Sequence, residues 1–281
     1  MPGANAKALA KAKTLAADVV ILDLEDSVAP EAKAEARTAV AAARREGGYG
    51  RRETVLRVNA LTTPWGRDDI RAAGEAAPLG VLVPKIESGQ DVIDADDALT
   101  EAGFAEEGAL WVMIETPRAI LNLADIAAAA KATRLAVFVM GLNDLAKETR
   151  AKAGVDRAPF YAPLSLAVTA ARAHGLTVID GVYNDIADAG GFEAECRQGL
   201  AFGFDGKTLI HPSQIDACNA VFAPTAEEIA QARAVIAAFA APENAGKGVI
   251  KVDGKMTELL HLEQAKRVVA MAEAIASPVP E

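Results

Sequence analysis

The chain has few of the residues that build disulfide frameworks or zinc sites: two cysteines and three histidines among 281 residues. Cys196 and Cys218 are isolated and show no metal-ligand spacing, which is typical of proteins in a reducing cytoplasm. His174, His211 and His261 are scattered along the chain and show no ligand spacing either. The sequence therefore disfavours a zinc centre.

Long apolar runs and a basic charge balance are also absent. No run of about 18 apolar residues occurs, and the N-terminus lacks the apolar region of a signal peptide. We therefore expect a soluble, cytoplasmic protein that does not bind membranes. The formal net charge is −10, with acidic and basic residues interspersed, whereas nucleic-acid binding needs a basic face. Nucleic acid is thus not expected as a partner.

Seven short apolar runs rich in β-branched residues recur along the chain, separated by alanine-rich stretches of helical period. The runs span residues 19–24, 54–59, 80–85, 109–114, 135–140, 176–181 and 203–210. Strands that are apolar on both faces and alternate with helices form parallel sheets covered by helices. Because the alternation is unbroken and no GxGxxG turn follows the early strands, we predict an α/β fold, a (β/α)₈ TIM barrel, over an open doubly wound sheet.

The predicted strands fall one short of the eight that close such a barrel. The chain begins with a loop and a helix where another strand is expected, so the first strand is missing or truncated. Either the natural start lies upstream or the barrel closes incompletely. We predict a catalytic barrel domain over residues 1–222 and a helical C-terminal extension, a lid, over residues 223–281.

Almost every predicted strand carries a charged or amide side chain at its carboxyl end, where βα barrels hold their reactive groups. These residues are Glu25, Asp26, Arg57, Asn59, Lys85, Glu87, Glu115, Asn143, Asp144, Asp180, Asp205 and Lys207. Glu115 and Asp144 follow adjacent strands, so their carboxylates can converge and, with waters and a chelating substrate, bind Mg²⁺. Spacing alone equally supports the alternative that both residues only cap the following helices.

Arg57 ends a strand, and its guanidinium suits bidentate binding of a carboxylate at the barrel mouth. The alternative is a structural ion pair with Glu25 or Asp26. Lys85 could act like Arg57, or it could only neutralise the acids around it. The sequence has no nucleophile elbow and no Cys–His pair, so covalent catalysis is disfavoured and a metal that stabilises an enolate fits better.

Six motifs of the chain resemble the citrate lyase β subunit-like group of the HpcH/HpaI aldolase superfamily. In chain order they are "VVILDLEDSVAPEAKAEAR", "LRVN", "VLVPKIES", "MIET", "GLNDLAKE" and "GFDGKTLIHPSQI". The resemblance implies a Mg²⁺-dependent βα barrel that acts on CoA thioesters such as citryl-, malyl- and citramalyl-CoA, with short keto or dicarboxylic acids as the acyl partners. It also implies a homo-oligomer, a trimer or hexamer.

The resemblance assigns roles to single residues. Arg57 would hold the carboxylate of the keto acid. Glu115 and Asp144 would bind Mg²⁺, and Glu115 would also contact the substrate. The loop that carries Gly141, Asn143 and Asp144 would cradle the acid.

Other residues would act around this centre. Glu25, Asp26 and Lys85 would surround the metal, and the two acids would accept hydrogen bonds from its waters. Asp23 would be a structural acid. The lid motif reads "GKMTE", which places Glu258 where lyase relatives carry an aspartate that acts on the acetyl-CoA carbon of a neighbouring subunit's site. At the N-terminus only "PG" remains of the relatives' "LFVPG" strand.

Three functions compete. The first is a carbon–carbon lyase that releases acetyl-CoA and a 2-keto acid such as oxaloacetate or glyoxylate. The alternative is a (3S)-malyl-CoA thioesterase that hydrolyses the thioester in the same Mg²⁺ pocket, because "GLNDLAKE", "DGVYND" and the lid glutamate resemble that branch. The third is a degenerate barrel that only binds acyl-CoA, which the presence of Arg57, Glu115 and Asp144 argues against.

Overall fold

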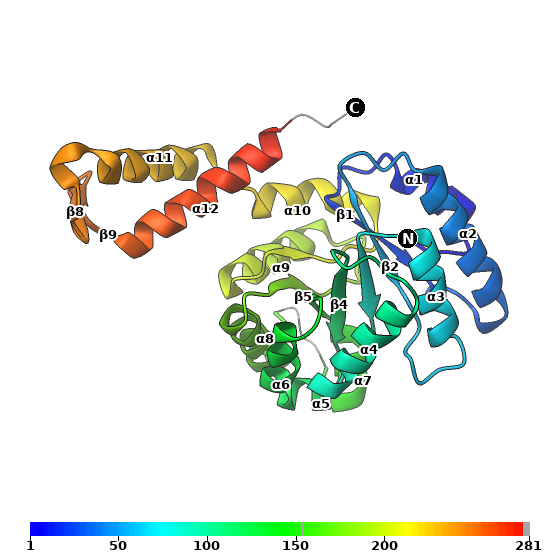
Figure 1. Cartoon of the computed structure of the whole chain (residues 1–281). Coiled ribbons are helices and arrows are strands. Elements are labelled where there is room, and N and C mark those ends of the chain that lie inside the picture. Colours follow the sequence, from blue (N-terminus) through cyan, green and yellow to red (C-terminus); the bar gives the residue numbers. More distant parts are fainter. Residues whose placement is uncertain (153, 155, 278–281) are drawn as a thin grey trace. The chain divides into compact units, whose positions relative to one another are not determined.

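A computed structural model describes residues 1–152, 154 and 156–277 (Figure 1). The chain forms two compact units, Met1–Cys218 and Asn219–Glu281. The predicted domain boundary, after residue 222, falls at the end of the helix that spans the junction of these units. None of the helices in the described ranges is long and apolar enough to cross a membrane.

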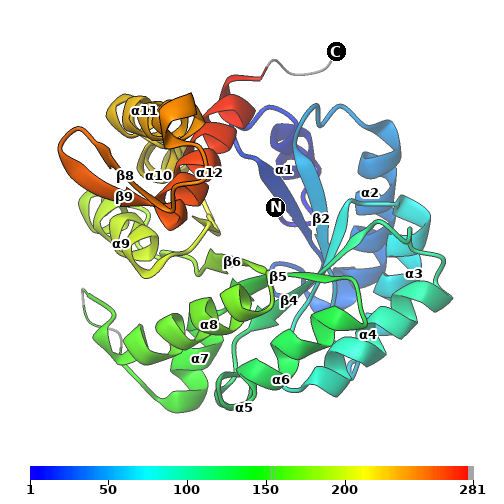
Figure 2. The same ribbon diagram turned by 60° about the vertical axis from the view of Figure 1, so that its left-hand side comes forward.

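The first unit is built on seven parallel strands whose order in the sheet equals their order in the chain. They are β1 (Val19–Asp23), β2 (Glu53–Arg57), β3 (Gly80–Val83), β4 (Ala109–Ile114), β5 (Leu135–Met140), β6 (Thr177–Asp180) and β7 (Gly206–Lys207). Figure 2 shows the sheet curled on itself with helices around its outer face. The predicted α/β barrel class is confirmed as a curled, TIM-like half-barrel of seven strands.

Ten helices accompany this sheet in the described residues. They are α1 (Ala6–Ala12), α2 (Lys33–Glu46), α3 (Gly66–Ala76), α4 (Gly89–Glu101), α5 (Pro117–Leu121), α6 (Leu123–Ala128), α7 (Leu142–Thr149), α8 (Tyr161–Ala173), α9 (Ala189–Phe202) and α10 (Ile215–Phe222). Side chains of Asn5, Ser88, Thr116 and Asp188 each accept a backbone N–H at a helix start. These caps satisfy amides that have no partner within the helix.

The expected first strand is reduced to a three-residue stub. Pro2 forms a parallel bridge with Asp23 of β1. The Asp23 amide donates to the carbonyl of Met1 at 2.9 Å, and the Gly3 amide donates to the carbonyl of Asp23 at 2.8 Å. Within the described residues no strand pairing joins β7 to this segment, so the ladder of the barrel is open there.

Side chains inside the curled sheet form one apolar cluster. Its buried members are Val55, Leu82, Trp111, Met113, Val137 and Val139. Successive side chains of a strand point to opposite faces, so residues two apart share a face. The alternation that places Val55 and Met113 in this cluster also directs Arg57 and Glu115 to the interior, at the carboxyl end of the sheet.

The described part of the second unit is built mainly from two helices and a hairpin: α11 (Ala226–Ala240), β8 (Val249–Val252), β9 (Lys255–Glu258) and α12 (Leu259–Ala276). Asp253 and Gly254 join the strands with φ values of 46° and 82°, the left-handed backbone that a tight hairpin turn requires. Ala232, Val235, Ile250, Val252 and Ala265 form its core. The extension is thus not purely helical, because residues 249–252 alternate between exposed and buried side chains, as a strand does.

Candidate functional site

Two carboxylates from adjacent strands meet at the barrel rim. Glu115 follows β4 and is 2% exposed, and Asp144 lies in the first turn of α7, directly after β5. The Lys85 ammonium donates a hydrogen bond to Asp144 Oδ2 and lies 3.3 Å from Glu115 Oε1. Both carboxylates therefore converge on a single positive charge.

The backbone of Lys85 is held in an unusual conformation. Its φ of 57° lies in the left-handed region, which a residue with a side chain adopts only when its surroundings impose it. The Lys85 amide donates to Glu115 Oε1 at 2.8 Å, so both the backbone and the side chain of Lys85 reach the same carboxylate. This contact orients Glu115 toward the rim.

Burial and Lys85 act in opposite directions on the two acids. Burial raises the pKa of Glu115 above its ordinary value, although the charge of Lys85 opposes this shift. Burial acts in the same sense on Asp144, but the hydrogen bond and charge of Lys85 outweigh it and lower the pKa of that carboxyl. A cation between the two oxygens therefore favours the ionised form of both groups.

Gly141 allows the loop after β5 to approach Glu115 closely. A Cβ atom at this position would lie 2.4 Å from Glu115 Cβ and 2.7 Å from Glu115 Oε2. Any side chain would displace the carboxylate, so glycine is required by close approach rather than by its own backbone conformation.

The donor set fits a hard divalent cation. Mg²⁺ prefers carboxylate oxygens and keeps several waters, and one or two protein carboxylates are its usual ligands. In the part of the chain that the structure describes, no group of three or more acidic, histidine or cysteine side chains could hold a metal. A cation held by Glu115 and Asp144 would thus take its remaining ligands from water or from a bound substrate.

Arg57 is paired in a way that the sequence did not predict. Its Nε lies 2.6 Å from Asp23 Oδ1 and its Nη2 lies 2.8 Å from Asp23 Oδ2, a bidentate ion pair. Glu25 and Asp26, the partners considered from the sequence, share the remaining nitrogen, Nη1, at 2.9 and 3.4 Å. Asp23 and Arg57 occupy paired positions of β1 and β2. Aligning the ends of these two runs could have revealed the pair.

Glu25 is the most strongly perturbed acid of the rim. Burial raises its pKa to about 8, against the opposing charge of Arg57 and with the aid of the neighbouring acids. Its Oε2 atom is buried and accepts no hydrogen bond, despite its distance of 2.9 Å from Arg57. This shift favours the neutral form of Glu25, which would leave less negative charge beside Nη1 of Arg57 for a bound carboxylate to compete with.

The arginine and the carboxylate pair share one neighbour. Arg57 Nη1 lies 3.8 Å from the sulfur of Met113, two residues before Glu115. The methyl carbon of Met113 lies 3.0 Å from the Cβ position of Gly141. The guanidinium and the convergent carboxylates thus flank one side chain at the end of the barrel interior.

Asn143 is exposed at the rim, where it forms a reciprocal amide pair with Asn184. Asn184 Nδ2 donates to Asn143 Oδ1 at 2.7 Å, and the opposite bond measures 3.3 Å. Asn184 lies in the loop after β6 and was not singled out from the sequence, although its motif "DGVYND" was noted.

Several other rim residues lie outside this site. Asp180 and Lys207 are buried with Arg157 and Glu195, and Asn59 is buried under the loop after β1. Asp205 pairs with Arg172, and Glu87 pairs with Arg118. Glu258 precedes α12 in the second unit, where its amide donates to His261 Nδ1 at 2.9 Å.

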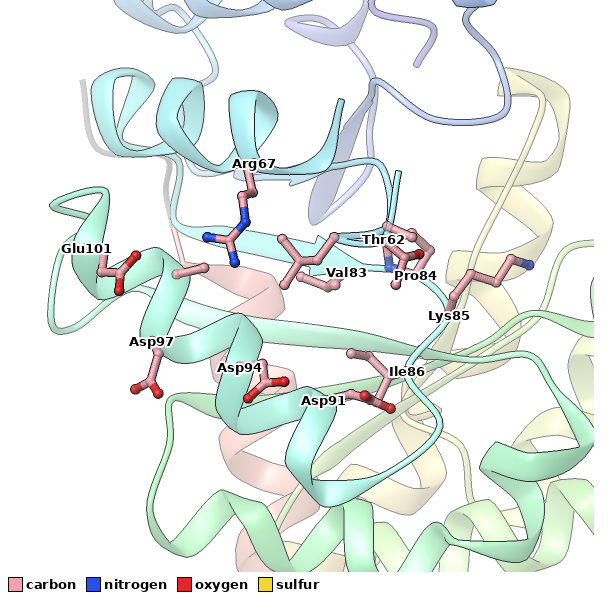
Figure 3. A pocket seen from close by; sticks show the side chains of 13 residues that line it. Thr62, Arg67, Val83, Pro84, Lys85, Ile86, Asp91, Asp94, Asp97 and Glu101 are labelled. Atoms are coloured by element: carbon pink, nitrogen blue, oxygen red, sulfur yellow. The ribbon is translucent and has the colours of Figure 1, made fainter. Parts of the chain in front are cut away.

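A cavity of about 310 Å³ lies between α3 and α4. Figure 3 shows that Arg67 and a row of acidic side chains of α4 line it, while the Lys85 side chain points away from them. The cavity contains none of Arg57, Glu115 and Asp144. We therefore locate the candidate site by the convergence of charged side chains at the rim.

Comparison with known sequences places the chain among enzymes of CoA thioesters and keto acids. The model of the HpcH/HpaI aldolase/citrate lyase family matches residues 1–212. A (3S)-malyl-CoA thioesterase of Cereibacter sphaeroides (strain KD131) is 46% identical over 277 residues, which cover 99% of this chain and 94% of that protein. Citrate lyase subunit beta of Escherichia coli K12 is 34% identical over 278 residues, 97% of this chain and 91% of that protein.

Solved structures give the same result. The protein CitE of Mycobacterium tuberculosis, in complex with magnesium, acetoacetate and coenzyme A, superposes with a TM-score of 0.73 at 32% identity and covers 96% of each chain. The citrate lyase beta subunit of M. tuberculosis complexed with oxaloacetate and magnesium gives a TM-score of 0.67 at 33% identity, covering 80% of this chain and 95% of that one. The chain belongs to the HpcH/HpaI aldolase/citrate lyase family.

Proposed function

We propose that the protein hydrolyses the thioester of (3S)-malyl-CoA, or of a similar 3-hydroxyacyl-CoA with a free carboxylate, with Mg²⁺ as cofactor. The observation that carries this proposal is the convergence of Glu115 and Asp144 on one cationic position, flanked by Arg57. The 46% identity to a (3S)-malyl-CoA thioesterase over 99% of the chain supports hydrolysis, as opposed to carbon–carbon cleavage.

Each residue of the site has a role in this proposal. Glu115 and Asp144 hold Mg²⁺, which when bound polarises a substrate carbonyl as a Lewis acid. Nη1 of Arg57 binds the free carboxylate of the acyl chain. Gly141 and Asn143 line the position of the acid, and Glu115 also contacts it.

The residues around the metal have supporting roles. Lys85 neutralises Glu115 and Asp144 when the cation is absent. Glu25 and Asp26 accept hydrogen bonds from waters at the rim. Glu258, supplied by the lid of a neighbouring subunit, accepts a proton from the water that attacks the thioester carbonyl, and returns it to the CoA thiolate that leaves when the C–S bond breaks. Because a glutamate carboxylate reaches farther than an aspartate carboxylate, Glu258 is displaced from the position that protonates an enolate, which disfavours cleavage.

The second candidate is the carbon–carbon lyase. It is favoured by relatives such as the L-malyl-CoA/beta-methylmalyl-CoA lyase of C. sphaeroides (strain ATCC 17025), which is 31% identical over 300 residues and covers 98% of this chain. The same pocket would stabilise the enolate of acetyl-CoA. The two candidates differ in which bond of one substrate breaks.

A product assay separates the candidates. Purified protein is incubated with (3S)-malyl-CoA and Mg²⁺, and free CoA, malate, acetyl-CoA and glyoxylate are quantified. We expect CoA and malate in equal amounts without glyoxylate. Acetyl-CoA and glyoxylate in equal amounts would establish the lyase and reject hydrolysis. If neither pair forms while Mg²⁺ leaves the thermal stability unchanged, both enzymatic proposals are rejected.

A further inference from the structure

One buried lysine near the rim has no carboxylate partner among the described residues. Lys33 begins α2 and is 6% exposed. Its ammonium donates to the carbonyl of Leu24, the carbonyl of Glu25 and Oδ1 of Asn59, each at 2.8 Å. The ring of Trp65 lies 5.3 Å from the same nitrogen. An ammonium has three donors, so this buried charge is fully hydrogen-bonded.

The first two of these bonds fix the segment that follows β1. The Glu25 amide donates to Asp23 Oδ1 at 2.9 Å, while the Glu25 carbonyl accepts from Lys33. The backbone of Glu25 is therefore held on both sides, and its side chain is held beside Nη1 of Arg57. Without the ammonium, Glu25 would keep its bond to Asp23 and the bond from the Val28 amide to its carbonyl at 3.0 Å, but it would lose its tie to α2.

The third bond connects Lys33 to the end of β2. Asn59 Nδ2 donates to the carbonyl of Leu24 at 2.9 Å and to Asp69 Oδ2 at 2.6 Å. Asp69 is fully buried and also pairs with Arg37 at 2.9 Å. Asn59 lies two residues after Arg57, so this network joins the loop of Glu25 to the strand end that carries Arg57.

We propose that Lys33 is a positioning residue for the carboxylate-binding guanidinium. Its ammonium holds the Glu25 segment and Asn59 so that Nη1 of Arg57 faces a bound carboxylate. The inference rests on the proposed function and deepens it. None of the three acceptors of Lys33 belongs to Glu115 or Asp144, so Lys33 acts on carboxylate binding and leaves the cation site unaffected.

The test is the variant Lys33→Met, with Mg²⁺ and oxaloacetate as probes in isothermal titration calorimetry. Methionine keeps the length of the side chain but cannot donate, so Asn59 Oδ1 loses the donor that it has among the described residues. The carbonyls of Leu24 and Glu25 keep their bonds from Asn59 Nδ2 and the Val28 amide but lose their tie to α2. We expect the Kd for Mg²⁺ to change less than about twofold, and the Kd for oxaloacetate with saturating Mg²⁺ to rise about tenfold or more. The KM for malyl-CoA should rise more than kcat falls.

Lys13→Met is the matched control. The Lys13 side chain is 18% exposed, pairs with Glu46 at 3.1 Å and lies 5.7 Å from the Tyr49 ring, at the opposite end of α2. Lys13→Met removes a half-buried cation far from the rim, so this variant should bind both Mg²⁺ and oxaloacetate as the wild type does. Should Lys33→Met fail to fold, Lys33→Ala with added propylammonium restores an ammonium in the vacated space, and propanol serves as the neutral comparison.

Loss of oxaloacetate binding alone, restored by propylammonium but not by propanol, supports the proposal. Equal loss of Mg²⁺ and oxaloacetate binding, or unchanged oxaloacetate binding in folded Lys33→Met, overturns it. A wild-type protein that binds no oxaloacetate overturns it, and the product assay with malyl-CoA then decides the proposed function separately. If Lys33→Met loses only oxaloacetate binding and the wild type does not cleave malyl-CoA, the proposed function is rejected and the role of Lys33 is still supported.

Discussion

The pKa values of Asp23 and Glu25 are shifted in opposite directions, although both side chains lie beside Arg57. Burial disfavours ionisation of both side chains. The two hydrogen bonds and the charge of Arg57 overcome this penalty at Asp23 and lower its pKa to about 2. Glu25 makes no such bonds, and burial raises its pKa to about 8. Direct hydrogen bonding to the charged form, and not distance alone, decides the protonation state at this rim.

This difference predicts a pH-dependent stability. The pKa of Glu25 is about 8 in the folded state against 4.5 ordinarily, so between these values the folded state holds a proton that the unfolded state has lost. The free energy of unfolding should therefore decrease as the pH rises from about 5 to about 8 and level off above that. Glu25→Gln should remove this slope. Urea denaturation of metal-free protein at several pH values tests this, and an equal slope in both proteins would contradict it.

Gly141 predicts a steric effect on the metal site. Gly141→Ala places a methyl group 2.4 Å from Glu115 Cβ, so the carboxylate must move and the folded state should lose about 1–3 kcal/mol. Mg²⁺ affinity should fall by at least about tenfold, because the ligand geometry is lost. Thermal denaturation with and without Mg²⁺ measures both effects.

Gly190→Ala is the control for this substitution. Gly190 lies in α9, and the nearest atom to its Cβ position, Asp188 Oδ1, is 3.8 Å away. The free energy of unfolding of Gly190→Ala should equal that of the wild type or exceed it by up to about 1 kcal/mol. Equal Mg²⁺ affinity in Gly141→Ala and the wild type would show that close packing on Glu115 is unimportant.

At the scale of elements, the last strand of the sheet depends on ion pairs. β7 contains two residues, and its Lys207 contacts Asp180 at 3.1 Å and Glu195 at 2.7 Å. Arg157 adds a bond to Asp180 at 2.8 Å, and Asp180 is fully buried. Two cations and two acids thus form a neutral buried group where the backbone ladder is short.

Asp180→Asn should therefore destabilise the barrel strongly. It leaves Lys207 and Arg157 with one acid between them, and breaking a buried pair in this way costs about 3–5 kcal/mol. The exposed pair of Arg197 and Glu193 provides the comparison, since Arg197→Ala should change stability by less than about 0.5 kcal/mol. Chemical denaturation measures the free energy of unfolding of both variants. A loss in Asp180→Asn as small as that in Arg197→Ala would contradict a structural role for the buried group.

Most elements could be predicted from apolar periodicity, and the exceptions have physical causes. The run over 203–210 was predicted as a strand, but only Gly206–Lys207 pairs with β6. Asp205 instead accepts the Val178 amide and pairs with Arg172 through its side chain. The stub at residues 1–3 is too short to show an apolar period, and it contains a proline.

The site could be predicted in part for a similar reason. Residues at strand ends are visible in the sequence, so the sequence predicts Arg57, Glu115 and Asp144 as members of the candidate site. The sequence predicts Asp23 as a structural acid, but it predicts neither its pairing with Arg57 nor a role for Lys33, because these depend on which strands and helices become neighbours. Sequence spacing shows the end of a strand but does not show which side chain of the next strand lies opposite.

At the scale of the whole molecule, the second unit has features of an interface. Its hairpin and the start of α12 expose large apolar side chains, among them Met256 at 76% and Leu259 and Leu260 at 52% each. Such clusters beside a polar residue of interest are typical of surfaces that contact a partner. They support the proposal that Glu258 completes the site of a neighbouring subunit in a homo-trimer or homo-hexamer.

Subunit mixing tests this arrangement. Asp144→Asn inactivates the barrel of a subunit and Glu258→Gln inactivates its lid, so each variant alone should have little activity. After unfolding and joint refolding in equal amounts, about a quarter of the sites should combine an intact barrel with an intact lid from another subunit. Recovery of that share of wild-type activity is expected. No recovery in mixed oligomers, checked by light scattering, would place Glu258 in its own subunit's site or outside any site.

The central claim is that Glu115 and Asp144 share one divalent cation at the barrel mouth, with Arg57 facing it. A crystal structure of the protein with Mg²⁺ and oxaloacetate tests this most directly. We expect one Mg²⁺ at about 2.1 Å from a carboxylate oxygen of each residue, the Lys85 ammonium displaced from between them, and a substrate carboxylate on Nη1 of Arg57. A structure in which Lys85 still bridges the two carboxylates at saturating Mg²⁺ would contradict the account.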